Sequence, residues 1–226
     1  MVVFFDIDDT LVDSESAHIK SIREICMEYL LIKGNPDQRD REWVNITDKY
    51  LKLYFEHKIT LEQQRIFRIT EFWKSNGKLI TEEQAEKVYQ QYHNLFLHSC
   101  LSFTETISSL QKLKNCKLGI ISNGTYSDQI FKLENNHLAH FFEEIIISEK
   151  IGFSKPDKEI FLIAARHVGM SPSDCIYVGN SYDIDYLGSL NSGMKAIWLK
   201  RGNSENCWPY ERIYSLNELA SHPYLK

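Results

Sequence analysis

Two aspartates near the start of the chain have the types and the spacing for metal or acid–base chemistry. Asp6 and Asp8 directly follow Val2–Phe5, an apolar run with the length of a short buried strand. In an open α/β sheet, ligands bind beyond the carboxyl ends of the strands. Two carboxylates held close together resist joint ionisation unless a cation or a shared proton compensates them. The pair indicates either a hard metal ion or a nucleophilic carboxylate beside a protonated general acid, and a turn that caps the next helix is the alternative.

Two further polar segments follow predicted strands. Ser122-Asn123-Gly124 comes after Leu118–Ile121, and its hydroxyl, amide and glycine suit an oxyanion or phosphate at a helix entrance. An ordinary helix cap is equally compatible with these three residues. Lys155, held before a proline, follows the strand predicted over 145–147 and can offer a point charge to phosphate or to a carboxylate. Taken alone, Lys155 is more often explained as a solvated surface lysine.

A second group of oxygen ligands follows the strand predicted over 175–178. Asn180, Asp183 and Asp185 lie within one short segment that begins at Gly179. Carboxylate and amide oxygens are the ligands that hard cations prefer, so this segment is a candidate part of a metal site. The alternative is again a capped helix start.

The elements that must position these residues form an alternating pattern over the second half of the chain. Apolar runs over 117–121, 145–147, 175–178 and 196–199 read as strands and are separated by helical stretches. Such alternation predicts a parallel sheet covered by helices on both faces. The block from about 39 to 99 reads as helices throughout and offers the first strand no partner, so that strand must join the sheet. We expect residues 1–13 and 101–226 to form an α/β core and residues 14–100 to form an inserted helical domain.

Composition narrows the class of protein. The 226 residues are 43% hydrophobic and 25% charged, with a formal net charge of -5 and no run of basic residues. We therefore expect a globular protein that binds no nucleic acid. No stretch approaches the roughly 18 apolar residues that span a bilayer, and no signal peptide is expected. The odd number and wide spacing of the cysteines predict reduced thiols and a cytoplasmic protein; they are Cys26, Cys100, Cys116, Cys175 and Cys207.

The order of the four motifs is more specific than any one of them. D-x-D, S-N-G, K-P and G-N-S-x-x-x-D follow one another, each at a predicted strand end. In this order and spacing the chain resembles the haloacid dehalogenase-like hydrolase superfamily over nearly its whole length. The helical insertion between the first two motifs resembles the α-helical cap of that superfamily. The resemblance implies a Rossmann-like core and the phosphatase branch.

The resemblance also implies roles for single residues. Asp6 would attack phosphorus and form an aspartyl-phosphate. Asp8 would protonate the leaving oxygen and then deprotonate the water that hydrolyses the intermediate. Ser122 and Lys155 would hold the phosphoryl oxygens, and Lys155 would also offset the charge on Asp6. The other residues implied to bind substrate are Thr10, Asn123 and Gly124.

Mg²⁺ is the implied cofactor. The resemblance assigns it to the Asp6 carboxylate, the Asp8 main-chain carbonyl, Asn180 and Asp185, with Asp183 as a possible substitute. One position departs from the family pattern, which commonly has an aspartate where this chain has Asn180. An amide oxygen can ligate Mg²⁺ but brings no charge, so we expect weaker Mg²⁺ binding than with two carboxylates.

The function expected on these grounds is Mg²⁺-dependent hydrolysis of a small phosphate monoester, a nucleotide or a sugar phosphate, through an aspartyl-phosphate. A 2-haloacid dehalogenase, a phosphomutase and a non-catalytic binding protein are the alternatives. Dehalogenases of the superfamily need no second aspartate, so Asp8 argues against the first of these. The expected partner is a small phosphate-bearing molecule, with no membrane contact, and the expected state is a monomer or a homodimer.

Overall fold

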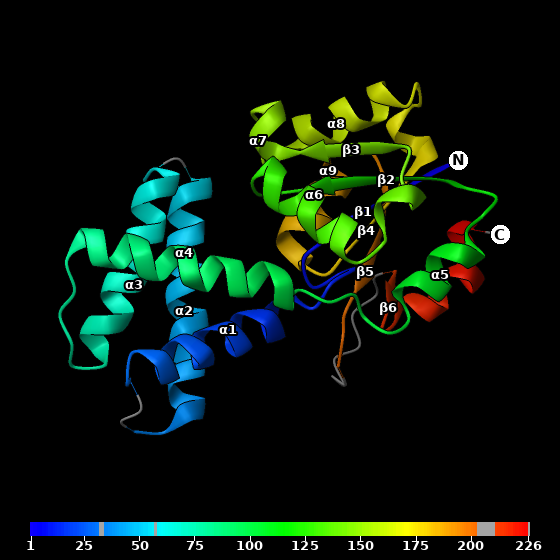
Figure 1. Ribbon diagram of the computed structural model, residues 1–226. Helices are drawn as coiled ribbons and strands as arrows, with labels where there is room; N and C mark the ends of the chain where they lie inside the picture. The colour runs from blue at the N-terminus through cyan, green and yellow to red at the C-terminus, as the bar shows by residue number, and fades with distance from the viewer. Residues whose placement is uncertain (32–33, 57, 203–210, 226) are drawn as a thin grey trace. The chain divides into compact units, whose positions relative to one another are not determined.

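The computed structural model describes residues 1–31, 34–56, 58–202 and 211–225 (Figure 1). Contacts within the chain divide it into two compact units. One unit comprises Met1–Asp13 and Leu101–Lys226, and the other comprises Ser14–Cys100.

The first unit is built on a six-stranded parallel sheet with strand order β3-β2-β1-β4-β5-β6. The strands are β1 (Val2–Phe5), β2 (Lys117–Ser122), β3 (Glu144–Ile147), β4 (Cys175–Gly179), β5 (Lys195–Leu199) and β6 (Arg212–Ile213). The sequence predicted an α/β fold with a Rossmann-like parallel sheet, and this prediction is confirmed. The first strand, far from the others in sequence, lies between β2 and β4 near the middle of the sheet. Only β6 was not predicted, because two residues are too few to show a period.

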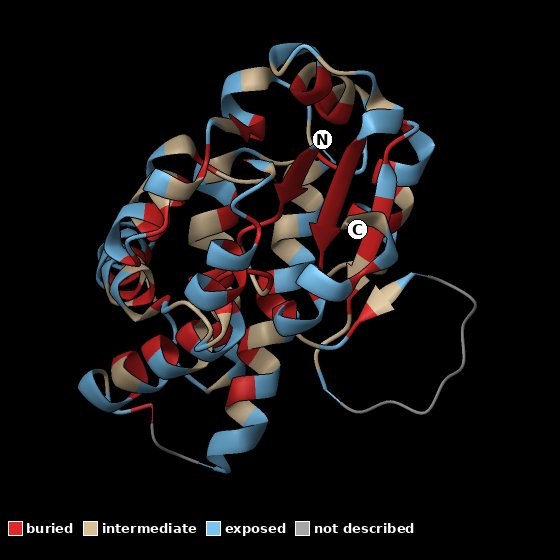
Figure 2. Ribbon diagram, turned by 90° about the vertical axis from the view of Figure 1, so that its right-hand side faces the viewer, coloured by how far each residue is buried: buried red, intermediate tan, exposed pale blue. Residues whose placement is uncertain are grey.

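The register of the central strands brings their carboxyl ends to one edge. Phe5, the last residue of β1, lies opposite Ile120 of β2 and Val178 of β4. All four residues of β1 are buried, as expected for a parallel strand covered on both faces (Figure 2). Gly119 in β2 makes room for the Phe4 ring, because a Cβ there would lie 2.6 Å from that ring. The residues that follow β1, β2 and β4 therefore emerge side by side.

Helices alternate with these strands as predicted, except that the short helix directly after β3 was not predicted. They are α5 (Thr106–Lys112), α6 (Tyr126–Asn135), α7 (Ser148–Ile151), α8 (Lys158–His167) and α9 (Gly188–Asn191). One core cluster joins Ile160 and Phe161 of α8 to Val2 and Phe4 of β1. A π-helical turn over Tyr182–Leu187 directly precedes α9.

The second unit, as far as the structure describes it, consists of helices. They are α1 (Ser14–Glu28), α2 (Pro36–Phe55), α3 (Leu61–Ser75) and α4 (Glu82–Ser99). Thr60 and Thr81 form capping boxes with Gln63 and Gln84, which fix the starts of α3 and α4.

Aromatic rings fill the core of the helical unit. The Trp43 ring meets Phe72 and Tyr92 edge to face, at centroid distances of 5.2 and 4.8 Å. Arg68 lies over the Trp43 and Tyr92 rings. Trp43, Phe72 and Trp73 are buried, whereas Tyr50, Tyr54 and Phe55 are half-buried.

Two further expectations concern the whole chain. Cys26, Cys100, Cys116 and Cys175 are free thiols, and Cys207 lies outside the described residues. Among the described residues, no helix is both long enough and apolar enough to cross a membrane.

Candidate active site

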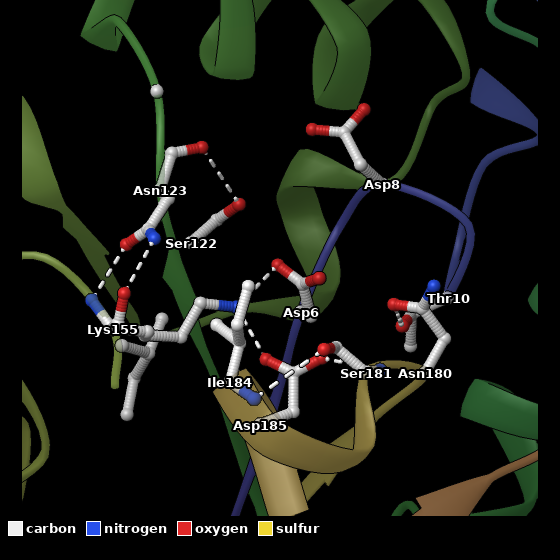
Figure 3. A network of polar contacts seen from close by, with 12 residues as sticks. Asp6, Asp8, Thr10, Ser122, Asn123, Lys155, Asn180, Ser181, Ile184 and Asp185 are labelled. Carbon is white, nitrogen blue, oxygen red and sulfur yellow. Dashed lines mark hydrogen bonds and ion pairs between the residues drawn. The ribbon is translucent and has the colours of Figure 1, made fainter. Parts of the chain in front are cut away.

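The polar residues at the strand ends converge at the carboxyl edge of the sheet (Figure 3). Asp6 follows β1, Ser122 ends β2 and Asn180 follows β4. Lys155 comes from the loop between α7 and α8, and Asp185 from the π-helical turn after β4. The four motifs, spread over about 180 residues of sequence, therefore form one site.

A buried lysine bridges two of the aspartates. Lys155 Nζ lies 2.8 Å from Asp6 Oδ1 and 2.7 Å from Asp185 Oδ1, and it donates to the Tyr177 hydroxyl at 2.7 Å. The Lys155 side chain is 2% exposed, so the surface-lysine alternative is wrong. Burial by itself would lower the pKa of Lys155, but Asp185 and Asp6 outweigh burial, and that pKa lies above its ordinary value. Lys155 is thus a fixed cation at the centre of the site.

Asp6 is the carboxylate next to Lys155 at the carboxyl edge of the sheet. Its main-chain nitrogen donates to Val178 O at 3.0 Å, which anchors it beside β4. Burial raises the pKa of Asp6 to about 6; Lys155 opposes this effect, and the charges of Asp185 and Asp8 add to it. Asp6 Oδ1 is held by Lys155, and Oδ2 has no hydrogen-bond partner within the described parts of the chain. Asp6 therefore keeps an oxygen available to a ligand.

Asp185 is turned inward beneath the end of β4. Its Oδ1 binds Lys155 and the Tyr177 hydroxyl, and its Oδ2 accepts from Ser181 N at 2.9 Å. Gly179 makes this possible, because a Cβ at that position would lie 2.4 Å from Asp185 Cγ. The glycine of the fourth motif is thus required by the packing of its last aspartate. Asp185 is 1% exposed, and both of its oxygens are engaged.

Tyr177 is a member of the site that the sequence did not single out. Its ring lies in β4, and its hydroxyl accepts from Lys155 and lies 2.9 Å from Ile121 O and 3.0 Å from Asp185 Oδ1. Burial raises the pKa of the phenol well above its usual range, and the two aspartates raise it further. Tyr177 therefore stays protonated and donates to one of its two acceptors.

The segment Ser122-Asn123-Gly124 lies at the carboxyl edge of the sheet and also positions Lys155. The Asn123 side chain pairs with the Lys155 main chain, donating to its carbonyl at 2.9 Å and accepting from its nitrogen at 2.8 Å. Ser122 is buried at the end of β2. The Gly124 nitrogen donates to Ser148 Oγ at 3.0 Å, and its predicted contact with substrate stays a prediction. Asn123 and Gly124 are therefore used in holding loops together.

Asp8 has separate partners. Its carboxylate points away from Asp6 (Figure 3) and is bound by α6, with Lys132 Nζ 2.6 Å from Oδ1 and Gln129 Nε2 2.9 Å from Oδ2. Neither Lys132 nor Gln129 belongs to any of the four motifs. Their three-residue spacing places both on one face of α6, and this spacing was the available signal.

Thr10 and Asn180 connect the first and fourth motifs. Thr10 Oγ1 donates to Asn180 Oδ1 at 3.3 Å, and Trp198 Nε1 donates to the Asn180 carbonyl at 2.9 Å. Thr10, predicted to bind substrate, is buried and holds this connection. Asp183, the possible substitute ligand, is exposed on the outer side of the π-helical turn.

An arginine outside the four motifs holds the loop that carries Asp8. Arg201 donates to the carbonyls of Asp9 and Thr10 at 3.3 and 2.8 Å, and its Nη1 lies 2.5 Å from Glu105 Oε1. Its guanidinium also stacks on the Phe103 ring, 3.5 Å from the centroid. Burial favours the neutral form of Glu105, but Arg201 outweighs burial and lowers the pKa of that carboxyl. No sequence pattern linked Arg201 to the first motif.

The fold and the site define a class: a Rossmann-like α/β protein with aspartates and a bridging lysine at the strand ends. A family model described as haloacid dehalogenase-like hydrolase matches residues 3–199. The chain therefore belongs to the haloacid dehalogenase-like hydrolase family.

Two proteins of similar sequence carry the names of phosphate-releasing enzymes. The chain is 34% identical to glyceraldehyde 3-phosphate phosphatase from Methanothermobacter thermautotrophicus, over 86% of this chain and 83% of that protein. It is 28% identical to pyrimidine 5'-nucleotidase YjjG from Escherichia coli, over 96% of this chain and 95% of that protein.

Solved structures show the same fold. The magnesium-bound HAD-hydrolase YfnB from Bacillus subtilis superposes with a TM-score of 0.80 at 23% identity, over 97% of this chain and 96% of that one. L-2-haloacid dehalogenase from Xanthobacter autotrophicus superposes with a TM-score of 0.76 at 16% identity, over 97% and 96%. At these identities the likeness establishes the fold alone.

Proposed function

We propose that this protein is a phosphatase that hydrolyses small phosphate monoesters, nucleotides or sugar phosphates, through an aspartyl-phosphate on Asp6. The bridge from Lys155 to Asp6 carries the proposal, because it fixes a cation beside a carboxylate whose second oxygen has no hydrogen-bond partner among the described residues. The names of the two relatives, one acting on a triose phosphate and one on nucleotides, support the same class of substrate.

The chain's own residues account for both halves of the reaction. In the first half, the Asp6 carboxylate forms a bond to phosphorus while the bond from phosphorus to the leaving oxygen breaks, and Asp8 gives that oxygen a proton. In the second half, a water molecule attacks phosphorus, Asp8 takes its proton, and the bond to Asp6 breaks. Lys155 and Ser122 hold the phosphoryl oxygens, and Lys155 keeps Asp6 ionised beside them.

The residues at the edge fit Mg²⁺. Asp6 Oδ2 has no partner within the described parts of the chain, and Asn180 Oδ1 accepts only one long bond, from Thr10 at 3.3 Å. We propose that these two oxygens and the Asp8 main-chain carbonyl hold the ion, whose charge lets a carboxylate approach an anionic phosphate. Asp185 acts through Lys155, because both of its oxygens are already engaged.

We propose that the helical unit Ser14–Cys100 is a cap that selects the leaving group and excludes water during the reaction. The four free thiols among the described residues support a reducing compartment and so a cytoplasmic protein. A monomeric or homodimeric state stays a prediction.

The test is phosphate release from p-nitrophenyl phosphate and from a panel of nucleotides and sugar phosphates, with Mg²⁺ and with EDTA. We expect release in Mg²⁺ and its loss in EDTA. Halide release from 2-haloacids without metal would show a dehalogenase, and transfer of phosphate to a second substrate hydroxyl would show a mutase. No turnover of any substrate by the wild type or by Asn180→Asp would contradict the proposal and favour a binding protein.

A further inference from the structure

Two buried polar side chains of α6 are directed at Asp8. Lys132 is 4% exposed and lies 2.6 Å from Asp8 Oδ1. Gln129, one turn earlier, is also buried and donates to Asp8 Oδ2 at 2.9 Å and to Asn123 O at 3.1 Å. Each carboxylate oxygen thus has its own donor, and the orientation of the carboxyl group is fixed at both ends.

The surroundings are shaped to hold these donors. Gly124 has no side chain, and a Cβ there would lie 2.8 Å from Gln129 Nε2. The Lys132 carbonyl accepts from Asn136 Nδ2 at 2.8 Å, and Asn136 Oδ1 in turn accepts from Ser102 N at 2.6 Å. These bonds tie the C-terminal end of α6, next to Lys132, to the segment that contains Ser102.

Burial of this kind is costly for a lysine, and a long side chain on a helix is more often found in solvent. The Asp8 side chain is 31% exposed, so the pair lies at the open edge of the site. A stabilising role would be served equally well by an apolar residue at position 132. The arrangement is explained more directly if the Lys132 ammonium group orients the partly exposed Asp8 carboxyl group.

We propose that Lys132 and Gln129 are positioning residues that hold the Asp8 carboxyl group in the orientation needed for proton transfer. The inference rests on the proposed function and adds two residues to it. Neither residue exchanges a proton or touches phosphorus; both act through Asp8. Proton transfer from a positioned group contributes about 10²- to 10⁴-fold to a rate, and part of that factor depends on these two donors.

The dependence of the lost kcat on the leaving group distinguishes this positioning role from a general loss of activity. An alkyl phosphate has a poor leaving group and needs the acid, whereas p-nitrophenyl phosphate needs it much less. For Lys132→Met we expect kcat on an alkyl phosphate to fall about 100-fold. On p-nitrophenyl phosphate kcat should fall only about 10-fold, and KM should change by less than about threefold on either substrate. Lys132→Arg should recover part of the lost rate, because it restores a cationic donor.

A double-variant cycle tests whether the two residues act through Asp8. In an Asp8→Asn background, Lys132→Met should cause almost no further loss on the alkyl phosphate. Lys117→Met is the matched control, because it removes an exposed ion pair with Glu143 and should leave both rates unchanged. Gln129→Met provides a milder second variant, should Lys132→Met fail to fold, and should show the same leaving-group dependence.

The outcomes are distinct. Equal losses on both phosphates, or a full further loss in the Asp8→Asn background, would overturn the positioning role while the proposed function stands. A wild type that hydrolyses neither phosphate would overturn the proposed function and this inference with it.

Discussion

The two lysines of the site show how differently one residue type can be used. Lys155 lies between Asp6 and Asp185 and also donates to Tyr177, with every one of these side chains nearly or fully buried. Lys132 reaches Asp8, whose side chain is 31% exposed at the open edge. The first arrangement makes a permanent charge, as phosphate binding requires. The second orients a group that must meet the leaving group.

We expect the largest loss of kcat from a substitution of Asp6, the carboxylate that Lys155 holds. Asp6→Asn removes the proposed nucleophile while keeping its size, so kcat should fall by about 10⁴-fold or more. Circular dichroism and the urea midpoint should show an intact fold. Hydrolysis by this variant at the wild-type rate would rule out the covalent route.

Lys155→Met tests the claim that Lys155 is a structural as well as a catalytic charge. It leaves Asp6 and Asp185 buried side by side without their cation, so the free energy of unfolding should fall by about 3 to 5 kcal/mol. Lys132→Met should cost less, because Asp8 can turn to solvent. The free energies of unfolding of both variants are measured by urea unfolding. Equal losses of stability in the two variants would contradict the contrast between the two lysines.

Gly179→Ala tests how the Asp185 position is maintained. Its Cβ would lie 2.4 Å from Asp185 Cγ, so we expect about 1 to 3 kcal/mol of destabilisation and a lower kcat. Gly119→Ala is the matched control, because its Cβ meets the Phe4 ring at 2.6 Å, away from the site. The control should lose stability but keep kcat per folded molecule. A fall in kcat of the same size in the control would contradict a specific effect on Asp185.

The smallest expected effect concerns the metal. Asn180→Asp adds a charge to the proposed ligand set, so half-maximal activity should need about ten times less Mg²⁺. The measurement is kcat against Mg²⁺ concentration for both proteins. An unchanged Mg²⁺ dependence would show that position 180 does not bind the ion directly.

The main parts of the site were predictable because each follows an apolar run. Val2–Phe5 is a short run of apolar residues, which predicts a buried strand with Asp6 directly after it. Parallel pairing of β1 with β2 and β4 then brings Ser122 and Asn180 to the same edge of the sheet. Lys155 was predictable only together with the other motifs, since its burial depends on two partners far away in the sequence. The fold class followed from the same runs.

What could not be predicted depends on side-chain direction. The direction of the Asp185 side chain, toward Lys155 and Ser181 N, depends on the π-helical turn and on the space left by Gly179, while its predicted role as a metal ligand stays a prediction. Lys132 lies on an amphipathic helix, where a lysine is expected to face solvent, and only the folded chain places Asp8 beside it. Short elements such as β6 and α7 contain too few residues to show a period.

Trapping of a phosphoryl group on Asp6 would distinguish the covalent route from direct attack by water. The Asp8→Asn variant is mixed with p-nitrophenyl phosphate and Mg²⁺, quenched in acid and digested, and the peptide that contains Asp6 is examined by mass spectrometry. Because this variant lacks the base for the second half of the reaction, we expect one added phosphoryl group on Asp6, and none in the Asp6→Asn/Asp8→Asn double variant. Phosphate release by the wild type with no phosphoryl group trapped on Asp6 in the Asp8→Asn variant would contradict the covalent route.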